Sequence, residues 1–115
     1  MSRASGLWLG AALFALPIAN ASAELPAYDL KAFCHKVASS GNVSDPQAIV
    51  KGCYQVERES YDALKPIWDK LPAKVRAYCN KVARANGPGS YIVLEGCVAE
   101  EQSSAKANAN SQLQR

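Results

Sequence analysis

The sequence predicts an all-α protein: two tandem antiparallel helical hairpins, about four helices in all, each stapled by a disulfide and packed together around a shared apolar centre. Three observations support this fold class. Apolar residues recur every three or four positions in four segments, a spacing typical of amphipathic helices. The chain repeats itself internally, and each repeat holds two of the four cysteines. In so short a chain, disulfides reduce the stability that a small core must supply.

The N-terminal segment has the three-part form of a secretory signal peptide. Arg3 gives a positive opening, an apolar run extends from Leu7 to Leu16, and small residues precede Glu24. A run of about ten apolar residues is too short to span a membrane, which needs roughly 20. We therefore predict that residues 1–23 are cleaved and that the mature chain is exported, to the periplasm or the external medium, without stable membrane insertion.

The mature chain is long enough for one domain, which we place at residues 24–102. Without Arg3 it carries 12 Lys and Arg against 10 Asp and Glu, a net charge of +2. This balance does not predict nucleic-acid binding. The stretch 103–115 consists mainly of Ser, Ala, Asn and Gln with a single Leu, and we predict that it is disordered.

The internal repeat is visible in two pairs of segments. Residues 32–38 read AFCHKVA and residues 77–83 read AYCNKVA, so five positions are identical and one exchanges Phe for Tyr. Further along, the Gly-Cys pairs at 52–53 and 96–97 are each followed by Glu four positions after the cysteine. The two repeats therefore agree around both their first and their second cysteine. This agreement predicts a duplication, with repeats at about 26–60 and 72–102.

The first repeat predicts two helices separated by a break at residues 39–42. Pro26 suits the first turn of the first helix. Ser44 is the predicted N-cap of the second helix, with Pro46 in its first turn and Gln47 completing a capping box. The apolar positions assigned to the buried faces are Leu30, Phe33, Cys34 and Val37, followed by Ile49, Cys53 and Val56.

The second repeat follows the same plan after a connector. Lys65 precedes a proline and is biased away from helical angles, so a break is predicted there. Pro72 begins the third helix, residues 86–89 end it, and Ser90 caps the fourth helix. The predicted buried positions are Val75, Tyr78, Cys79, Val82, Val93, Leu94, Cys97 and Val98.

The four cysteines allow three pairings, and helix geometry favours one of them. At about 1.5 Å per residue, Cys34 and Cys53 lie roughly 9 and 12 Å from the turn between their helices. Cys79 and Cys97 lie at similar heights in the second hairpin. We therefore predict the disulfides Cys34–Cys53 and Cys79–Cys97. The chain has no Cys-x-x-Cys, so we expect neither redox chemistry nor a metal or cofactor.

Two glycines stand inside predicted helices, immediately before the second cysteine of each repeat. Glycine in a helix interior costs about 1 kcal/mol relative to alanine, so it needs a reason. We interpret Gly52 and Gly96 as positions where the partner helix approaches closely at the disulfide.

Few residues suggest chemistry. His35 is the only histidine, and the aligned residue of the second repeat is Asn80. No acid pair or nucleophile accompanies it in the sequence, so an exposed polar role is favoured over catalysis. Lys74, Lys81 and Arg84 project to one side of the third helix, either as a solvated face or as a surface for an anionic partner.

Trp68 is the only tryptophan of the mature chain, and with Ile67 and Leu71 it occupies the connector. It is interpreted either as a core residue that seals the hairpins together or as an exposed interaction anchor, and core packing is favoured.

The segments from Tyr61 to Lys65, around Trp68, and from Gly96 to Val98 resemble small exported bacterial proteins of uncharacterised function. This resemblance implies a periplasmic or secreted location and no particular activity. The leading hypothesis is a non-enzymatic binding or interaction module, such as an inhibitor or a stress-protective factor, with an extracytoplasmic protein or anionic surface as its partner. The alternatives are a carrier of a small apolar ligand between the two hairpins and an enzyme that uses His35.

Overall fold

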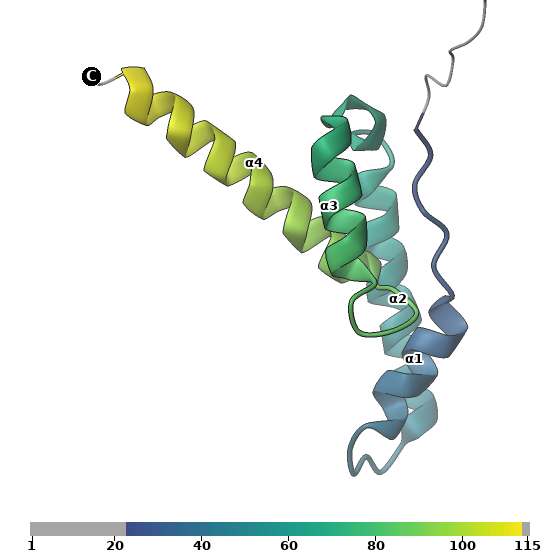
Figure 1. Ribbon diagram of the computed structural model, residues 1–115. Helices are drawn as coiled ribbons and strands as arrows, with labels where there is room; N and C mark the ends of the chain where they lie inside the picture. Colours follow the sequence, from purple (N-terminus) through teal and green to yellow (C-terminus); the bar gives the residue numbers. More distant parts are fainter. Residues whose placement is uncertain (1–22, 114–115) are drawn as a thin grey trace, which may run out of the picture.

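The structure is a computed structural model that describes residues 23–113, and its regular secondary structure over that range is entirely helical (Figure 1). The two hairpins are α1–α2, called the first hairpin, and α3–α4, called the second hairpin; α2 also packs against α4. The elements in chain order are α1 (Leu30–Ser39), α2 (Pro46–Leu64), the 3-10 turn η2 (Trp68–Lys70), α3 (Ala73–Ala83) and α4 (Tyr91–Leu113). The predicted fold class is confirmed, whereas the predicted signal peptide lies outside the described residues except for Ala23.

Each hairpin is closed by the disulfide that helix geometry predicted. The Cα atoms of Cys34 and Cys53 are 5.6 Å apart, and those of Cys79 and Cys97 are 5.5 Å apart. Cys34 and Cys79 have no exposed surface. The bonds therefore cross between helices on their inner sides, where the two chains of each hairpin face one another.

The first helices begin later than predicted because aspartates cap them. α1 starts at Leu30, not near Pro26, and the Asp29 carboxylate accepts a hydrogen bond from the Ala32 N–H at 3.0 Å. α2 is capped by Asp45 instead of Ser44: the Asp45 side chain accepts from the Ala48 N–H at 3.2 Å. A short carboxylate three residues ahead of a free N–H satisfies one of the unpaired donors of the first turn.

The start of α4 is capped from two directions. Ser90 is its N-cap as predicted, since the Ser90 Oγ accepts from the Val93 N–H at 3.3 Å. Glu57 of α2 lies opposite, fully buried, and accepts hydrogen bonds from the Tyr91 N–H and the Ser90 hydroxyl, both at 2.6 Å. A carboxylate at a helix N-terminus is stabilised by the free N–H groups and the helix dipole. This contact joins α2 of the first hairpin to α4 of the second.

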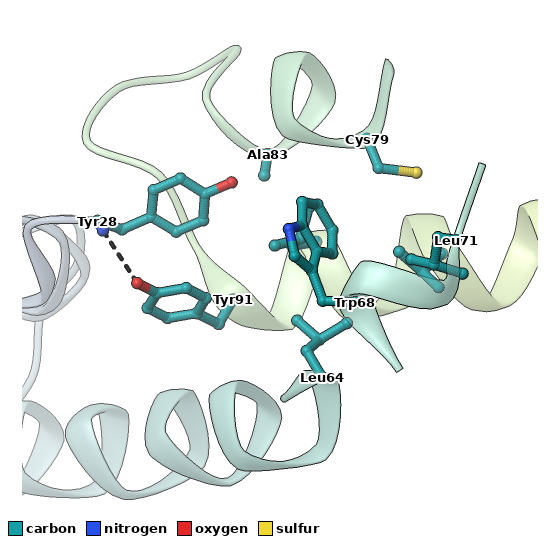
Figure 2. Close-up of a cluster of buried hydrophobic side chains, with 9 residues drawn as sticks. Tyr28, Leu64, Trp68, Leu71, Cys79, Ala83 and Tyr91 are labelled. Carbon is teal, nitrogen blue, oxygen red and sulfur yellow. Dashed lines mark hydrogen bonds between the residues drawn. The ribbon is translucent and has the colours of Figure 1, made fainter. Parts of the chain in front are cut away.

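The hydrophobic core lies in the second hairpin and the segments that cover it (Figure 2). Trp68 lies between Leu64 and α3, with 4% of its surface exposed. The core side chains are Tyr28, Leu64, Trp68, Leu71, Cys79, Ala83, Tyr91, Leu94 and Val98. The predicted break after α2 is confirmed, since α2 ends at Leu64 and the short turn η2 then directs the indole inward. The expected departure of Lys65 from helical angles is wrong, because its φ of −53° and ψ of −48° are helical and the chain leaves the helix only after it.

The N-terminal strap, residues 24–29, has no regular secondary structure and lies across the core. The Trp68 Nε1–H donates to the Glu24 carbonyl at 3.0 Å. The Tyr91 hydroxyl donates to the Pro26 carbonyl at 2.7 Å and accepts from the Tyr28 N–H at 3.0 Å. Pro26 thus belongs to a segment whose backbone groups bond to side chains, which explains why it does not begin a helix.

The tail predicted to be disordered is helical as far as Leu113. α4 continues through residues 103–113 without a break and projects away from the other helices (Figure 1). Side chains from Gln102 to Gln112 are all exposed. No Gly or Pro follows Gly96, and Ala, Gln and Lys are good helix formers, so propensity extends α4 where packing does not.

Candidate functional site

An apolar groove lies on the first hairpin, beside the start of α4. It is lined by two residues of α1, by five residues of α2, which we call its floor, and by Ile92 of α4. The groove encloses about 410 Å³, a volume suited to a small molecule or a few side chains. Its lining residues are all apolar or glycine: Phe33, Val37, Ala48, Ile49, Gly52, Cys53, Val56 and Ile92.

The groove leaves large aliphatic side chains in contact with water. Val37 and Ile49 are 38% and 37% exposed, and Val56 and Ile92 are both 44% exposed. The sequence assigned Val37, Ile49 and Val56 to buried helix faces, and that prediction is wrong. The periodicity identified the apolar face correctly, but no element of residues 23–113 covers it. A contiguous apolar patch is typical of an interaction site, whereas scattered single residues are not.

Gly52 belongs to the floor of this groove. A Cβ added to Gly52 would meet no atom within 4 Å, and the same holds for Gly96. The interpretation that a partner helix approaches these glycines closely is therefore wrong. Gly52 lowers the helix propensity of α2, although no neighbouring atom requires a glycine there. The absence of a side chain keeps the groove floor open.

The second hairpin also exposes residues that the helical pattern assigned to its buried side. Tyr78 is 54% exposed and Val93 is 43% exposed. A shallow depression of about 380 Å³ lies beside Tyr78, between Lys74, Val75 and Glu101. Unlike the groove of the first hairpin, this depression has charged residues in its lining.

The basic residues predicted on α3 are all exposed, as a shared helix face requires. The Arg84 guanidinium lies 5.8 Å from the centroid of the Tyr28 ring, a distance that permits a cation–π contact. Lys74 borders the depression beside Tyr78. Arg84 therefore helps hold the strap, whereas Lys74 and Lys81 remain exposed on α3.

His35 and Trp68 have contrasting positions. His35 is exposed on α1, and residues 23–113 contain no cluster of three or more metal-ligating side chains. Trp68 is in the core, so it does not form an exposed interaction anchor. Of the residues that the sequence singled out for interaction, only the lysines and Arg84 are accessible.

Two tyrosines fasten the strap to the second hairpin. Their ring centroids lie 4.6 Å apart, and the Tyr28 hydroxyl donates to Asn80 Oδ1 at 2.7 Å. Burial raises the pKa of Tyr28 to about 12, and burial also raises the pKa of Tyr91. A Cβ on Gly89, which has a φ of 103°, would lie 2.6 Å from the Tyr28 ring, so only glycine fits there.

No protein-family model, curated protein or solved structure matches this chain. In addition, no helix among residues 23–113 is long and apolar enough to cross a membrane. The chemistry of the groove is therefore the basis for a functional proposal.

Proposed function

We propose that this protein is a non-enzymatic binding module that acts outside the cytoplasm and holds an apolar segment of a partner protein in the groove of the first hairpin. The groove is the observation that carries the proposal. Four aliphatic side chains around it are more than one third exposed, and its floor includes a helical glycine in open space. Covering these side chains would be favourable by roughly 25 cal/mol per Å² of apolar surface.

The two disulfides support the extracytoplasmic part of the proposal. Disulfides persist in oxidising compartments and are rare where cytosolic thiols keep cysteines reduced. Both disulfides stabilise the hairpins that form the groove, and Cys53 is itself part of the lining. The groove therefore depends on an oxidising location.

A carrier of a small apolar ligand is a second candidate, because the groove has the volume of a ligand site and includes Ile92 of the other hairpin. The groove is largely open to solvent, however, and most small-ligand sites bury the greater part of their ligand. An open trough instead suits several side chains presented by a partner helix or strand.

Photo-crosslinking in the native compartment tests the proposal. A photoreactive residue at Ile49 or Val56 should give a discrete protein adduct, whereas the same residue at Val93 of the second hairpin should not. Val93 is a matched control, since it is an exposed aliphatic residue on the other disulfide-closed hairpin. Equal adducts from all three positions would contradict the proposal.

Native mass spectrometry of the purified protein separates the two candidates. A bound small molecule that is lost in Val56→Asp would favour the carrier. A protein adduct at Ile49 with no bound small molecule favours the docking module. Val93→Asp is the control for the added charge.

A further inference from the structure

One side of α2 carries basic and aromatic side chains in alternation, and it is exposed except at Tyr61, whose ring packs against Tyr91. We call this set the α2 stripe: Lys51, Tyr54, Arg58, Tyr61 and Lys65. These residues follow one another at intervals of three or four positions, so they lie on one side of the helix. Lys51 and Arg58 each follow a groove residue by two positions, which places the stripe on the side of α2 opposite the apolar groove.

The α2 stripe lies along two neighbouring surface depressions. One is about 440 Å³ and is lined by Lys51, Tyr54, Gln55 and Arg58. The next is about 480 Å³ and continues from Arg58 past Tyr61 to the N-terminal strap. Because both include Arg58, the depressions run end to end along the helix.

The cations that have no acidic partner in the described part of the chain lie at one end of the α2 stripe. Lys51 and Arg58 are exposed, and no salt bridge within residues 23–113 involves them. Lys65 instead lies 3.9 Å from Asp62, and the Lys65 end also has Glu24 and Asp69 nearby in the depressions beside the strap. The part available to an anion is therefore the run from Lys51 to Arg58.

We propose that the α2 stripe binds a linear acidic polysaccharide, independently of the groove. Lys51 and Arg58 are seven residues apart, or roughly 10.5 Å along the axis, a spacing that lets the two cations reach alternate carboxylates of a polyuronate chain. Arg58 can hold a carboxylate through two parallel hydrogen bonds. Tyr54 lies between the cations, and its flat ring can pack against the C–H face of a sugar.

The shape of the stripe favours a polysaccharide over other anions. A membrane presents a flat surface, whereas these cations form a single line and Tyr61 is only partly exposed, beneath the strap. A peptide made of acidic residues lacks the regular C–H faces of sugar rings against which the tyrosine between the cations can pack. The positions 44 residues later, Glu95, Val98 and Gln102, lack this pattern, so the feature belongs to α2 alone.

Isothermal titration of the purified, oxidised protein with alginate oligomers, a linear polyuronate, tests the inference. The double variant Lys51→Glu/Arg58→Glu should weaken binding by at least about tenfold, as expected for the loss of charge-assisted hydrogen bonds. Tyr54→Ala should weaken it about fivefold to tenfold. Tyr54 and both cations are exposed, so thermal unfolding should stay unchanged.

The matched control is Lys74→Glu/Lys81→Glu on α3, which makes the same change in net charge and should leave alginate binding intact. Equal weakening by this control would show a response to net charge alone and would overturn the assignment. Tighter binding to polyglutamate or to phosphatidylglycerol vesicles than to alginate would also overturn it, in favour of an acidic protein or a membrane.

Discussion

The two hairpins have the same disulfide plan but different interiors. In the second hairpin, Cys79 belongs to a core that includes Trp68, Leu94 and Val98. In the first hairpin, α1 and the part of α2 that faces it, residues 30–56, contain only two buried side chains, Cys34 and Ala38, and the buried side chains of α2 lie beyond this part, from Glu57 to Leu64. A disulfide therefore adds to packing in the second hairpin and substitutes for packing in the first. That substitution leaves apolar side chains of α1 and α2 uncovered, and they form the groove.

The largest expected effects come from removing each disulfide in turn, which tests whether the two bonds have different roles. Cys79→Ala/Cys97→Ala should lower the free energy of unfolding of the whole domain by about 3–5 kcal/mol, because the bond crosses the core. Cys34→Ala/Cys53→Ala should instead release residues 30–56 while the second hairpin stays folded. Hydrogen exchange measures both effects by region. Equal loss of protection in both hairpins, in both variants, would contradict the proposed difference.

Glu57 joins the hairpins, and its removal should weaken the contact between them. Glu57→Ala leaves the buried Tyr91 N–H and Ser90 hydroxyl without their acceptor, at a cost of about 2–3 kcal/mol in the free energy of unfolding. The equivalent residue in the second repeat, Glu101, is half-buried and serves as the control. Chemical denaturation should show a much smaller change for Glu101→Ala. Similar losses for both variants would argue against the capping role.

Alkaline pH should weaken the strap contact of the second hairpin. The pKa of Tyr28 is about 12 in the folded protein and about 10 when unfolded, so its contribution is complete below pH 10. As pH rises from 10 to 12, unfolding should become easier by about 2 kcal/mol. Tyr28→Phe should reduce this loss, as followed by circular dichroism. An unchanged alkaline transition in Tyr28→Phe would show that another group controls it.

The smallest expected effect is a gain in stability. Gly52→Ala should raise the free energy of unfolding by roughly 0.5–1 kcal/mol, because the added methyl meets no atom and alanine favours the helix. Gly96→Ala should give a similar gain in the second hairpin. Thermal unfolding measures both. A loss of stability in Gly52→Ala alone would indicate that the added methyl group disturbs a contact already made at the groove floor.

The fold was predictable from the sequence because its main signals are local. Helical spacing located all four long helices, and the heights of the cysteines on antiparallel helices selected the correct pairing. The extent of α4 was missed because the stretch 103–113 has no apolar face, yet contains no residue that ends a helix. The choice of Asp45 over Ser44 was missed because both residue types are good N-caps.

The candidate site was predictable only in part. The apolar positions of α1 and α2 were identified, but periodicity does not show whether another element covers them. The strap contacts and the Glu57 cap join residues more than 30 positions apart, and such contacts leave no local pattern. The equivalent positions of Glu57 and Glu101 after the cysteines were the available signal, although only Glu57 is fully buried.

The free end of α4 has a practical consequence. Residues 103–113 of α4 project away from the other helices, whereas the strap places the backbone of Glu24 against the indole of Trp68. An affinity tag or a fluorescent label attached beyond α4 will leave the groove and the α2 stripe unobstructed. The same addition between Ala23 and Glu24 will crowd the strap that covers the core.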